Sequence, residues 1–292
     1  MNCIDQVVTD SYALYHGDCV EVLRGLPDAS VGYSIFSPPF ASLYTYSNSP
    51  RDMGNVRNDG EFFEHFEFLI AELRRVMKPG RNVSFHCMDM PSSKERDGVI
   101  GLKDFPGDLL RAFQRHGFIF HAKATIWKDP VTAMTRTKAL GLLHKSIRER
   151  SEMTRMGIPD YLITVRCPGE SEHVTHTAEE FPVSQWQRYA SPVWMDIDPS
   201  DTLQFRSARE HDDERHICPL QLGVIRRGIA LWTNPGDIVL SPFGGIGSEP
   251  YTAVEMGRKA VAVELKDSYY RQMVANVANA KAKTADLFAE AA

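Results

Sequence analysis

The stretch Asp237–Glu264 constrains the fold of this chain more than any other part of the sequence. It opens with Asp237–Ser241, a short run rich in β-branched residues, which predicts a buried parallel strand. Gly244-Gly245-Ile246-Gly247 follows, and glycines let a backbone turn tightly and approach a ligand without a steric penalty. This order of strand and glycines is typical of the first half of a nucleotide-binding unit.

A helix and a second strand are expected to follow the glycines. Ser248 is a typical N-cap for a helix over about residues 249–256, and Gly257 is a typical C-terminal stop. Lys259–Glu264 reads as a strand that ends in a carboxylate. Glu264 follows Gly247 by seventeen residues, close to the roughly twenty at which an acidic side chain meets a ribose hydroxyl pair. Because the third glycine of the dinucleotide pattern is missing, a plain glycine-rich hairpin stays open at this point.

The composition is that of a globular protein. The 292 residues are 43% apolar and 24% charged, which fits one large α/β domain with an insertion or two small domains. No apolar run approaches the roughly 18 residues of a membrane span, and the first ten residues show no secretory signal. We therefore expect a cytoplasmic protein that acts without a membrane. The cysteines are scattered without a Cys-x-x-Cys pair, which favours reduced thiols and no metal site; they are Cys3, Cys19, Cys87, Cys167 and Cys218.

Strands and helices alternate along most of the chain, which predicts a mainly parallel sheet with right-handed crossovers. Strands are expected over 12–16, 31–36, 82–87, 118–127 and 158–167. Helices are expected over 19–26, 61–77, 105–115, 219–232 and 268–284. Residues 168–215 read as irregular, with Trp186 and Trp194 among turn residues and acids, and are interpreted as part of an insertion.

The strand Val31–Phe36 carries no charge, as is typical of a strand that is covered on both faces. It runs into Ser37-Pro38-Pro39-Phe40, where two prolines end the ladder. Phe40 is therefore expected at the carboxyl edge of the sheet, where open α/β folds bind ligands. Residues 41–60 follow as a long loop, and loops of this length are usually lids or linkers. We favour a lid.

A basic segment lies inside an acidic protein. The chain has a formal net charge of −5, but Lys123 to Arg166 holds nine Lys and Arg against four acids. Such a patch is typical of contacts to phosphates, and a solvated helix of mixed charge is the alternative. The candidate DNA contacts are Lys128, Arg136, Lys138, Lys145, Arg148, Arg150 and Arg155.

Ser37–Phe40, taken together with Phe243-Gly244-Gly245-Ile246-Gly247, resembles the amino-group DNA methyltransferases. These enzymes carry [D/N/S]-P-P-[Y/F/W] at the catalytic edge and F-x-G-x-G at the S-adenosylmethionine site. The catalytic motif comes first and the cofactor motif last, which resembles the permuted β group with its many bacterial and phage modification enzymes. Three further segments are similar to that family: Tyr15–Cys19 (YHGDC), Arg75–Gly80 (RVMKPG) and His216–Gln221 (HICPLQ).

The resemblance implies a Rossmann-like methyltransferase fold, α/β in class, with a mainly parallel seven-stranded sheet and an inserted target-recognition region. We expect residues 1–127 to form the catalytic half, residues 128–215 to form that insertion with one core strand near 158–167, and residues 216–292 to form the cofactor half. The cofactor implied is S-adenosylmethionine, and the residues implied to hold it are Asp18, Cys19, His216, Gln221, Ser241, Phe243, Gly244, Gly245, Gly247, Ser248, Glu249 and Glu264. Many members have Asp where this chain has Ser241, so a carboxylate near the cofactor's ammonium group is either absent or supplied by Glu249.

The expected chemistry concerns an exocyclic amine, which is a poor nucleophile because its lone pair is delocalised into the ring. Ser37 Oγ and the carbonyl of Pro38, held stiffly by Pro39, are the expected acceptors of its hydrogens, and Phe40 would stack on the base. A base inside a duplex must be flipped out, which costs a few kcal/mol. A serine hydroxyl is too weak a base to take the proton first, so we expect the proton to leave to solvent. His86 is interpreted as a residue at the edge of the core.

Serine at position 37 resembles the cytosine-N4 subgroup, so the predicted reaction is site-specific N4 methylation of cytosine in double-stranded DNA, with base flipping. Adenine-N6 methylation stays open. More distant alternatives are an NAD-dependent oxidoreductase that uses the same glycine loop, a DNA-binding protein of the same ancestry without catalysis, and a methyltransferase of RNA or of a protein amide. The sequence leaves open the recognition site, a partner nuclease of a restriction-modification system, and whether the protein is a monomer or a homodimer.

Overall fold

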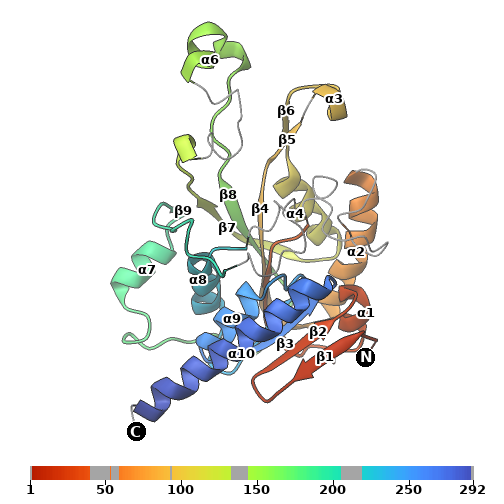
Figure 1. Ribbon diagram of the computed structural model, residues 1–292, viewed down its shortest axis with the longest axis vertical. Helices are drawn as coiled ribbons and strands as arrows, with labels where there is room; N and C mark the ends of the chain where they lie inside the picture. Colours follow the sequence, from red (N-terminus) through yellow and green to blue (C-terminus); the bar gives the residue numbers. More distant parts are fainter. Residues whose placement is uncertain are drawn as a thin grey trace.

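Helices cover both faces of one sheet (Figure 1). The computed structural model describes residues 2–39, 53, 59–92, 94–132, 144–204 and 219–290. These residues form a nine-stranded sheet whose strands, in spatial order, are β1 (Asp5–Val8), β2 (Tyr12–His16), β11 (Lys259–Glu264), β10 (Ile238–Ser241), β3 (Val31–Phe36), β4 (Met77–Met88), β8 (Asp160–Arg166), β7 (Ile119–Ile126) and β9 (Val193–Trp194).

The five strands from β2 to β4 in this order run parallel, and β8 is antiparallel to both of its neighbours. The predicted α/β class and the mainly parallel sheet are therefore confirmed. The predicted strand number was too low by two. β1 and β9 extend the sheet at its two edges, β1 antiparallel to β2 and β9 parallel to β7. Runs of four and two residues show too little periodicity to be recognised in a sequence.

Each face of the sheet is buried under its own set of helices. The first face packs against α1 (Cys19–Arg24), α2 (Asp59–Val76) and α4 (Phe105–Arg115), and the second against α8 (Leu222–Trp232), α9 (Ser248–Glu255) and α10 (Asp267–Glu290). Successive residues of a strand point to opposite faces. Phe36 of β3 accordingly joins the first core, while Tyr33 and Ile35 join the second. The lack of charge in β3 thus reflects burial on both sides.

An early and a late segment of the sequence meet at the centre of the sheet. β10 lies between β11 and β3, with Val239 opposite Tyr33 and Leu240 opposite Ser34. Ser34 Oγ donates a buried hydrogen bond of 2.9 Å to the carbonyl oxygen of Leu240. The parallel pairing of these two strands brings their carboxyl ends side by side.

The segment after residue 127 is more closely attached to the core than predicted. Its strand near 158–167 is confirmed as β8, but residues 168–204 also supply α7 (Val183–Tyr189) and β9. Trp194 is only 2% exposed. Arg227 of α8 lies 5.0 Å from the ring centroids of both Tyr189 and Trp194 and pairs with Asp196 at 2.7 Å. This part is therefore less irregular than predicted, because it contains a helix and a strand and long-range aromatic packing anchors it.

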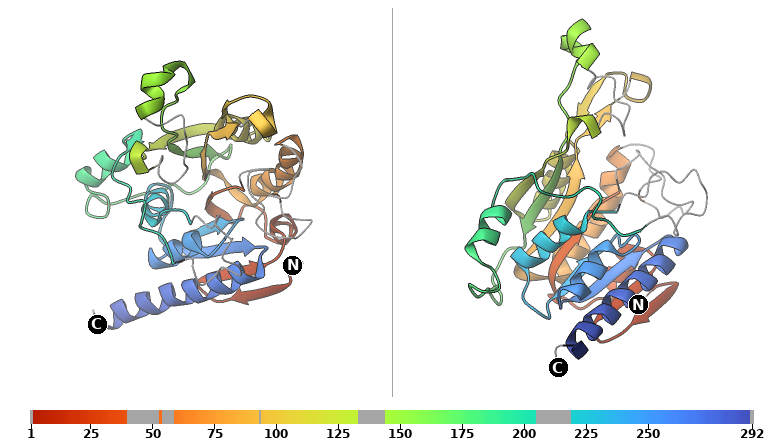
Figure 2. Two further views of the ribbon diagram at one scale, coloured as in Figure 1. Left: turned by 45° about the horizontal axis from the view of Figure 1, so that its top comes forward. Right: turned by 60° about the vertical axis from the view of Figure 1, so that its left-hand side comes forward.

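Two projections extend beyond the carboxyl edge of the sheet (Figures 1 and 2). One carries α6 (His144–Glu149), followed by a 3₁₀ turn (Ser151–Met153). The other is the hairpin of β5 (Met90–Ser92) and β6 (Gly101–Lys103), with α3 (Lys94–Asp97) between its strands. Among the described residues, no helix is both long and apolar enough to cross a membrane.

Candidate active site at the carboxyl edge of the sheet

The glycine loop after β10 is pressed against β11 and α10. The amide of Gly244 donates a 2.7 Å hydrogen bond to the carbonyl oxygen of Val263, and a Cβ at Gly244 would come within 2.7 Å of Met273 Sδ. Gly247 has φ 95°, a left-handed conformation that L residues rarely adopt. Close packing therefore favours glycine at 244, and the left-handed backbone conformation favours it at 247.

Gly245 forms the open side of this loop. Its φ is 51°, and a Cβ built on it would meet no other atom within 4 Å. Its amide donates a 2.8 Å hydrogen bond to Oε2 of Glu264, whose Oε1 accepts another of 2.8 Å from the amide of Lys266. Glu264 at the end of β11 thus fixes the loop and leaves backbone at Gly245 that a ligand can approach.

The helix after the loop begins one residue earlier than its predicted cap implies. Gly247 is the N-cap, because its carbonyl oxygen accepts the first helical hydrogen bond from Tyr251 at 2.9 Å. Ser248 is already the first helical residue, so its prediction as the N-cap was wrong. The left-handed turn at Gly247 redirects the chain before Ser248. Gly257, with φ 72°, follows the end of α9 as predicted.

A carboxyl and a hydroxyl group are buried beside this loop. Glu249, in the first turn of α9, is 5% exposed. Burial, and then the nearby charge of Glu264, raise the pKa of Glu249 to about 8. Ser241 Oγ is buried without a hydrogen-bond partner. These groups can bind a cationic or polar ligand that supplies the missing interactions.

Asp18 and Cys19 follow β2, whose last residue, His16, is paired with Glu264. β2 is parallel to β11, and the amide of Gly17 donates a 2.9 Å hydrogen bond to the carbonyl oxygen of Glu264. Asp18 Oδ1 caps α1 by accepting from the amide of Glu21 at 3.0 Å. Cys19 is buried, and burial raises the pKa of its thiol. Asp18 therefore has one structural role in addition to its predicted ligand contact.

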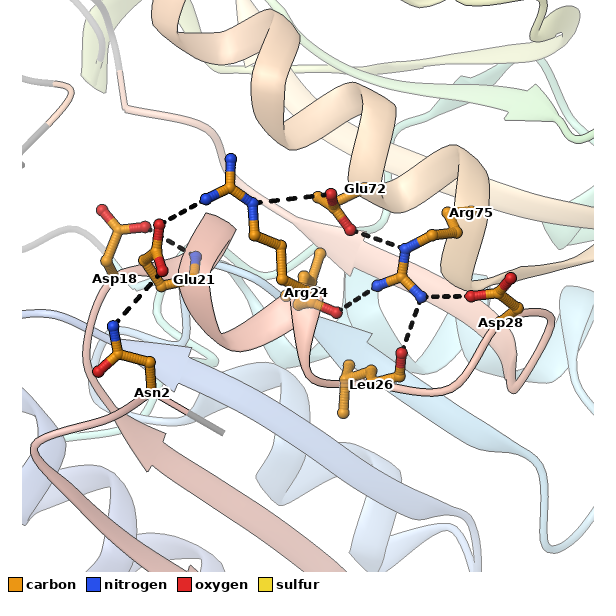
Figure 3. Close-up of polar contacts among 9 residues, drawn as sticks. Asn2, Asp18, Glu21, Arg24, Leu26, Asp28, Glu72 and Arg75 are labelled. Atoms are coloured by element: carbon orange, nitrogen blue, oxygen red, sulfur yellow. Dashed lines mark hydrogen bonds and ion pairs between the residues drawn. The ribbon is translucent and has the colours of Figure 1, made fainter.

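A network around Arg75 holds α1 and its following turn in place (Figure 3). The guanidinium of Arg75, in the last turn of α2, donates to the carbonyl oxygens of Leu23 at 2.6 Å and Leu26 at 2.8 Å. It also pairs with Asp28 at 2.5 Å and with Glu72 at 2.8 Å. Asp18 caps the start of α1, and Arg75 binds carbonyl groups at and beyond the end of α1. Arg75 therefore helps to hold the helix that positions Asp18.

Ser37 is aligned with His86 by the register of two parallel strands. The last pair of β3 and β4 is Phe36 opposite Phe85, so the next residues, Ser37 and His86, face each other. Ser37 Oγ and His86 Nδ1 are 3.2 Å apart. Pro38 and Pro39 are buried directly after Ser37. Phe40 lies outside the described residues.

Two further side chains, those of Asp160 and Lys128, extend the row of contacts that begins with Ser37 and His86. Asp160, the first residue of β8, is opposite Met88 and therefore diagonal to His86 on the same face. His86 Nε2 lies 3.2 Å from Asp160 Oδ2, off the line of a well-formed hydrogen bond. Lys128 Nζ, beyond β7, is 2.5 Å from Asp160 Oδ1. We call Ser37, His86, Asp160 and Lys128 the edge row.

The buried carboxylate of the edge row is held in its charged form. Burial raises the pKa of Asp160, but His86 and Lys128 outweigh this effect, so that the pKa of Asp160 lies below its usual range. Sequence reasoning missed both His86 and Asp160, and it assigned Lys128 to DNA. Only the cross-strand register of β3, β4, β8 and β7 brings these four residues together, and no spacing in the sequence contains that register.

The predicted DNA contacts are only partly described. Lys145 and Arg148 lie on α6, and Arg150 and Arg155 follow it. The side chains of Lys145 and Arg150 are 78% and 70% exposed and pair weakly with Glu149 and Glu152, respectively. Lys128 contacts Asp160, and its side chain is 37% exposed. Arg136 and Lys138 lie outside the described residues.

Three other predicted cofactor residues have different outcomes. Phe243 packs against Phe36 and Phe66 with ring centroids 5.7 and 6.4 Å apart. Gln221 is the N-cap of α8, and its Oε1 is buried without a partner. His216 lies outside the described residues. No three His, Cys, Asp or Glu side chains in the described part of the chain are grouped so as to hold a metal ion.

Comparison with known proteins identifies one family. A family model for N6/N4 DNA methylases matches residues 33–275. The type II methyltransferase M.Cfr9I of Citrobacter freundii is 23% identical over 279 residues, covering 88% of this chain and 84% of its own. The DNA adenine methyltransferase YhdJ of Escherichia coli is 22% identical over 268 residues, with coverages of 90% and 81%.

Other relatives are longer than this chain. The alignment covers 66% of M.BglII of Bacillus subtilis and 55% of M.BamHI of Bacillus amyloliquefaciens, each 23% identical to this chain. Among solved structures, the cytosine-N4-specific PvuII DNA methyltransferase has a TM-score of 0.68 at 17% identity, covering 94% of this chain and 90% of its own. The DNA modification methylase TTHA0409 of Thermus thermophilus, complexed with S-adenosyl-L-methionine, has a TM-score of 0.66 at 21% identity, with coverages of 93% and 96%. These likenesses show a shared fold.

Proposed function

This chain belongs to the N6/N4 DNA methylase family, and we propose that it transfers a methyl group from S-adenosylmethionine to the N4 amine of a cytosine flipped out of double-stranded DNA. Family membership removes the support for an NAD-dependent oxidoreductase. The proposal extends to a site-specific modification enzyme that acts in the cytoplasm of a bacterial cell or phage-infected host, since the relatives named above are bacterial.

One observation carries the proposal. Ser37 follows β3 at the edge where the glycine loop follows β10, and β3 and β10 are paired neighbours. A methyl acceptor at Ser37 would therefore lie beside a ligand at Gly245. Alignment of two reactants in this way is worth up to roughly 7–11 kcal/mol of a reaction barrier. Ser37 Oγ and the carbonyl of Pro38 would accept hydrogens from the amine and help direct its lone pair.

The glycine-loop residues fit S-adenosylmethionine. The open backbone at Gly245 can approach the methionine part, and the Glu264 carboxylate, which has lone pairs beyond its two backbone bonds, can accept from ribose hydroxyls. Glu249 would pair with the ammonium group, which would restore its charge. Ser241 Oγ would gain a polar partner. When bound, this cofactor supplies an electrophilic methyl group on a positively charged sulfur.

The choice of cytosine rests on residue 37. Serine at this place resembles the cytosine-N4 subgroup, and the PvuII enzyme, which is described as cytosine-N4-specific, shares the fold. The second candidate is adenine-N6 methylation, which the described activity of YhdJ favours. We assign DNA backbone contacts to the exposed cations of the α6 projection and target recognition to residues 128–215 as part of the same proposal.

The test is methyl transfer to DNA of varied sequence. The protein is incubated with isotope-labelled S-adenosylmethionine and duplex DNA, which is then digested to nucleosides and analysed by mass spectrometry. We expect labelled N4-methylcytosine, and we expect none with the Ser37→Ala variant. Labelled N6-methyladenine would contradict the base assignment but keep the reaction class. Absence of any labelled nucleoside across the sequences would contradict the proposed function.

A further inference from the structure

The edge row is an unusual arrangement for a strand edge that needs only stability. A buried ion pair is costly, because removing each charge from water carries a penalty of several kcal/mol. Asp160 is 4% exposed. Two residues deeper in the sheet, Ser84 and Thr164 already join β4 and β8 by a neutral hydrogen bond of 2.8 Å. The charges of the edge row therefore call for a reason beyond strand pairing.

We propose that His86, backed by Asp160 and Lys128, takes up through Ser37 the proton that the target amine loses on methylation. This inference rests on the proposed function and adds proton-accepting and positioning residues to it. It replaces the expectation, drawn from the weak basicity of serine, that the proton leaves directly to solvent.

The ionised carboxylate of Asp160 selects the tautomer of His86. With the proton on Nε2, the positive end of the N–H dipole is near the charge of Asp160 Oδ2, which lies 3.2 Å from Nε2 and off the line of a well-formed hydrogen bond. With the proton on Nδ1, a lone pair on Nε2 would face that carboxylate and be repelled. Nδ1 is therefore the acceptor, and the Ser37 hydroxyl donates to it across 3.2 Å. The lone pairs of Ser37 Oγ are then free to accept from an amine.

The proton transfer balances without a further reactant. As the new nitrogen–carbon bond forms and the sulfur–carbon bond breaks, the positive charge moves from sulfur to the amine nitrogen. That nitrogen gives a proton to Ser37 Oγ while the hydroxyl proton of Ser37 passes to His86 Nδ1. His86 becomes an imidazolium stabilised by Asp160, and Ser37 is a neutral hydroxyl again. Because Nε2 of His86 is buried, the proton returns through Nδ1 and Ser37 to solvent once the methylated base has left.

Lys128 keeps Asp160 ready for this role. At 2.5 Å from Oδ1 its ammonium group opposes protonation of the buried carboxyl. Among the described residues, the charged groups in contact with His86 or with its partner are Asp160 on β8 and Lys128 beyond β7. Tyr161, with Asp89 near its hydroxyl group and Lys123 over its ring, belongs to the opposite face of the sheet. In the described part of the chain, the electrostatic surroundings of His86 on this face thus depend on two side chains.

The first test uses the unliganded protein. Nitrogen NMR of ¹⁵N-histidine-labelled protein at about pH 8, where a histidine of ordinary pKa is neutral, reports which ring nitrogen of His86 carries the proton. We expect Nε2 to carry it and Nδ1 to be the acceptor. In Asp160→Asn the preference for a proton on Nε2 should weaken, because the carboxylate that favours it is lost. A proton on Nδ1 in the wild type would overturn the proposal.

The second test follows single-turnover methylation against pH. His86→Gln should lower the rate by about 100-fold or more, in the range of general acid–base catalysis, with unchanged affinity for S-adenosylmethionine and DNA. The acid limb of the wild-type pH profile should vanish in His86→Gln. A purely structural role would lower the rate equally at every pH. Lys128→Met should give a smaller loss than Asp160→Asn.

Matched variants control for damage to the fold. His116→Gln removes a histidine at the C-terminal end of α4 that pairs with Glu67 of α2. Lys259→Met removes an exposed lysine at the amino end of β11. Both variants should leave the rate unchanged. Wild-type rate and pH dependence in His86→Gln would overturn this inference while the proposed function stands. If the wild type methylates no DNA, the proposed function and this inference both fall. The NMR measurement needs no methylation, so it tests the tautomer of His86 separately from the reaction. Should His86→Gln fail to fold, Asp160→Asn and the wild-type NMR spectrum decide.

Discussion

Glu264 Oε2 accepts a 2.8 Å hydrogen bond from the backbone amide of Gly245, which ties the end of one central strand to the loop that leaves its neighbour. The same carboxylate is the expected partner of the cofactor ribose. Loop position and cofactor affinity are therefore linked through one side chain.

Glu264→Gln should weaken binding of S-adenosylmethionine by about 10-fold to 100-fold, since hydrogen bonds to charged groups contribute about 1.5–3 kcal/mol. Titration calorimetry measures this. Glu255→Gln, at the exposed end of α9 beside Arg226, is the control and should bind normally. Equal affinity of Glu264→Gln and the wild type would refute the ribose role.

Gly245→Ala and Gly257→Ala make a matched pair. Both positions have left-handed φ values, 51° and 72°, and at both a Cβ would meet no other atom within 4 Å. Each variant should lose about 1–2 kcal/mol of stability from the strained backbone. Only Gly245→Ala should also bind S-adenosylmethionine more weakly, because its methyl group enters the proposed ligand space. Urea unfolding and calorimetry separate the two effects, and equal cofactor affinity in both variants would count against this position of the ligand.

Glu249 should make the unliganded protein less stable as the pH rises. Its folded pKa of about 8 lies above the ordinary value of 4.5, so between these values the folded state holds a proton that the unfolded state has lost. The contribution of Glu249 to stability is thus complete below about pH 4.5 and declines up to about pH 8. Glu249→Gln should show a flatter stability profile in urea unfolding at a series of pH values. An unchanged slope would show that Glu249 is ionised in the folded protein.

Arg75→Lys should destabilise the protein by about 1–3 kcal/mol, because a lysine cannot reproduce the forked donation to the carbonyl oxygens of Leu23 and Leu26. The midpoint of urea unfolding measures the loss. Arg111 is an exposed residue of α4 that pairs with Asp104 and Asp108. Arg111→Lys should therefore change the midpoint little. Equal midpoints for the two variants would mean that the network of Figure 3 contributes no more than a surface ion pair.

Arg148→Ala and Arg150→Ala should each reduce the salt dependence of DNA binding by about one unit of slope, because each phosphate contact releases about one counterion. Binding to a labelled duplex at several salt concentrations gives the slope. The control is Lys281→Ala, which removes an exposed lysine of α10. An unchanged slope in both arginine variants would remove α6 from the DNA interface.

The sequence predicted those parts of the fold that depend on local patterns. The bounds of β3 and β11 were found to the residue, because each is a short apolar run between turn signals. Ser248 was misassigned, since the left-handed conformation of Gly247 cannot be read from its neighbours. β9 was missed because Trp194 is buried through its contacts with Arg227 and Tyr189, which are distant or irregularly spaced in the sequence.

The candidate site likewise has one part that the sequence predicted and one part that it did not. The glycine loop and Ser37 lie in contiguous motifs, so the sequence located them. His86 and Asp160 are 74 residues apart and meet only through the antiparallel register of β4 and β8. The register between two strands depends on the packing of the whole sheet, so no local pattern in the sequence reveals which residues will be opposite each other.

The position of β10 between β11 and β3 has a consequence for folding during synthesis. β3 leaves the ribosome early, but its neighbour β10 arrives only with residues 238–241. Until then Val31–Phe36, a six-residue strand without charge, has one edge unpaired, which is a template for aggregation. Nascent chains that stop before Ile238 should therefore depend on chaperones, and the candidate site can assemble only after residues 238–247 have been made.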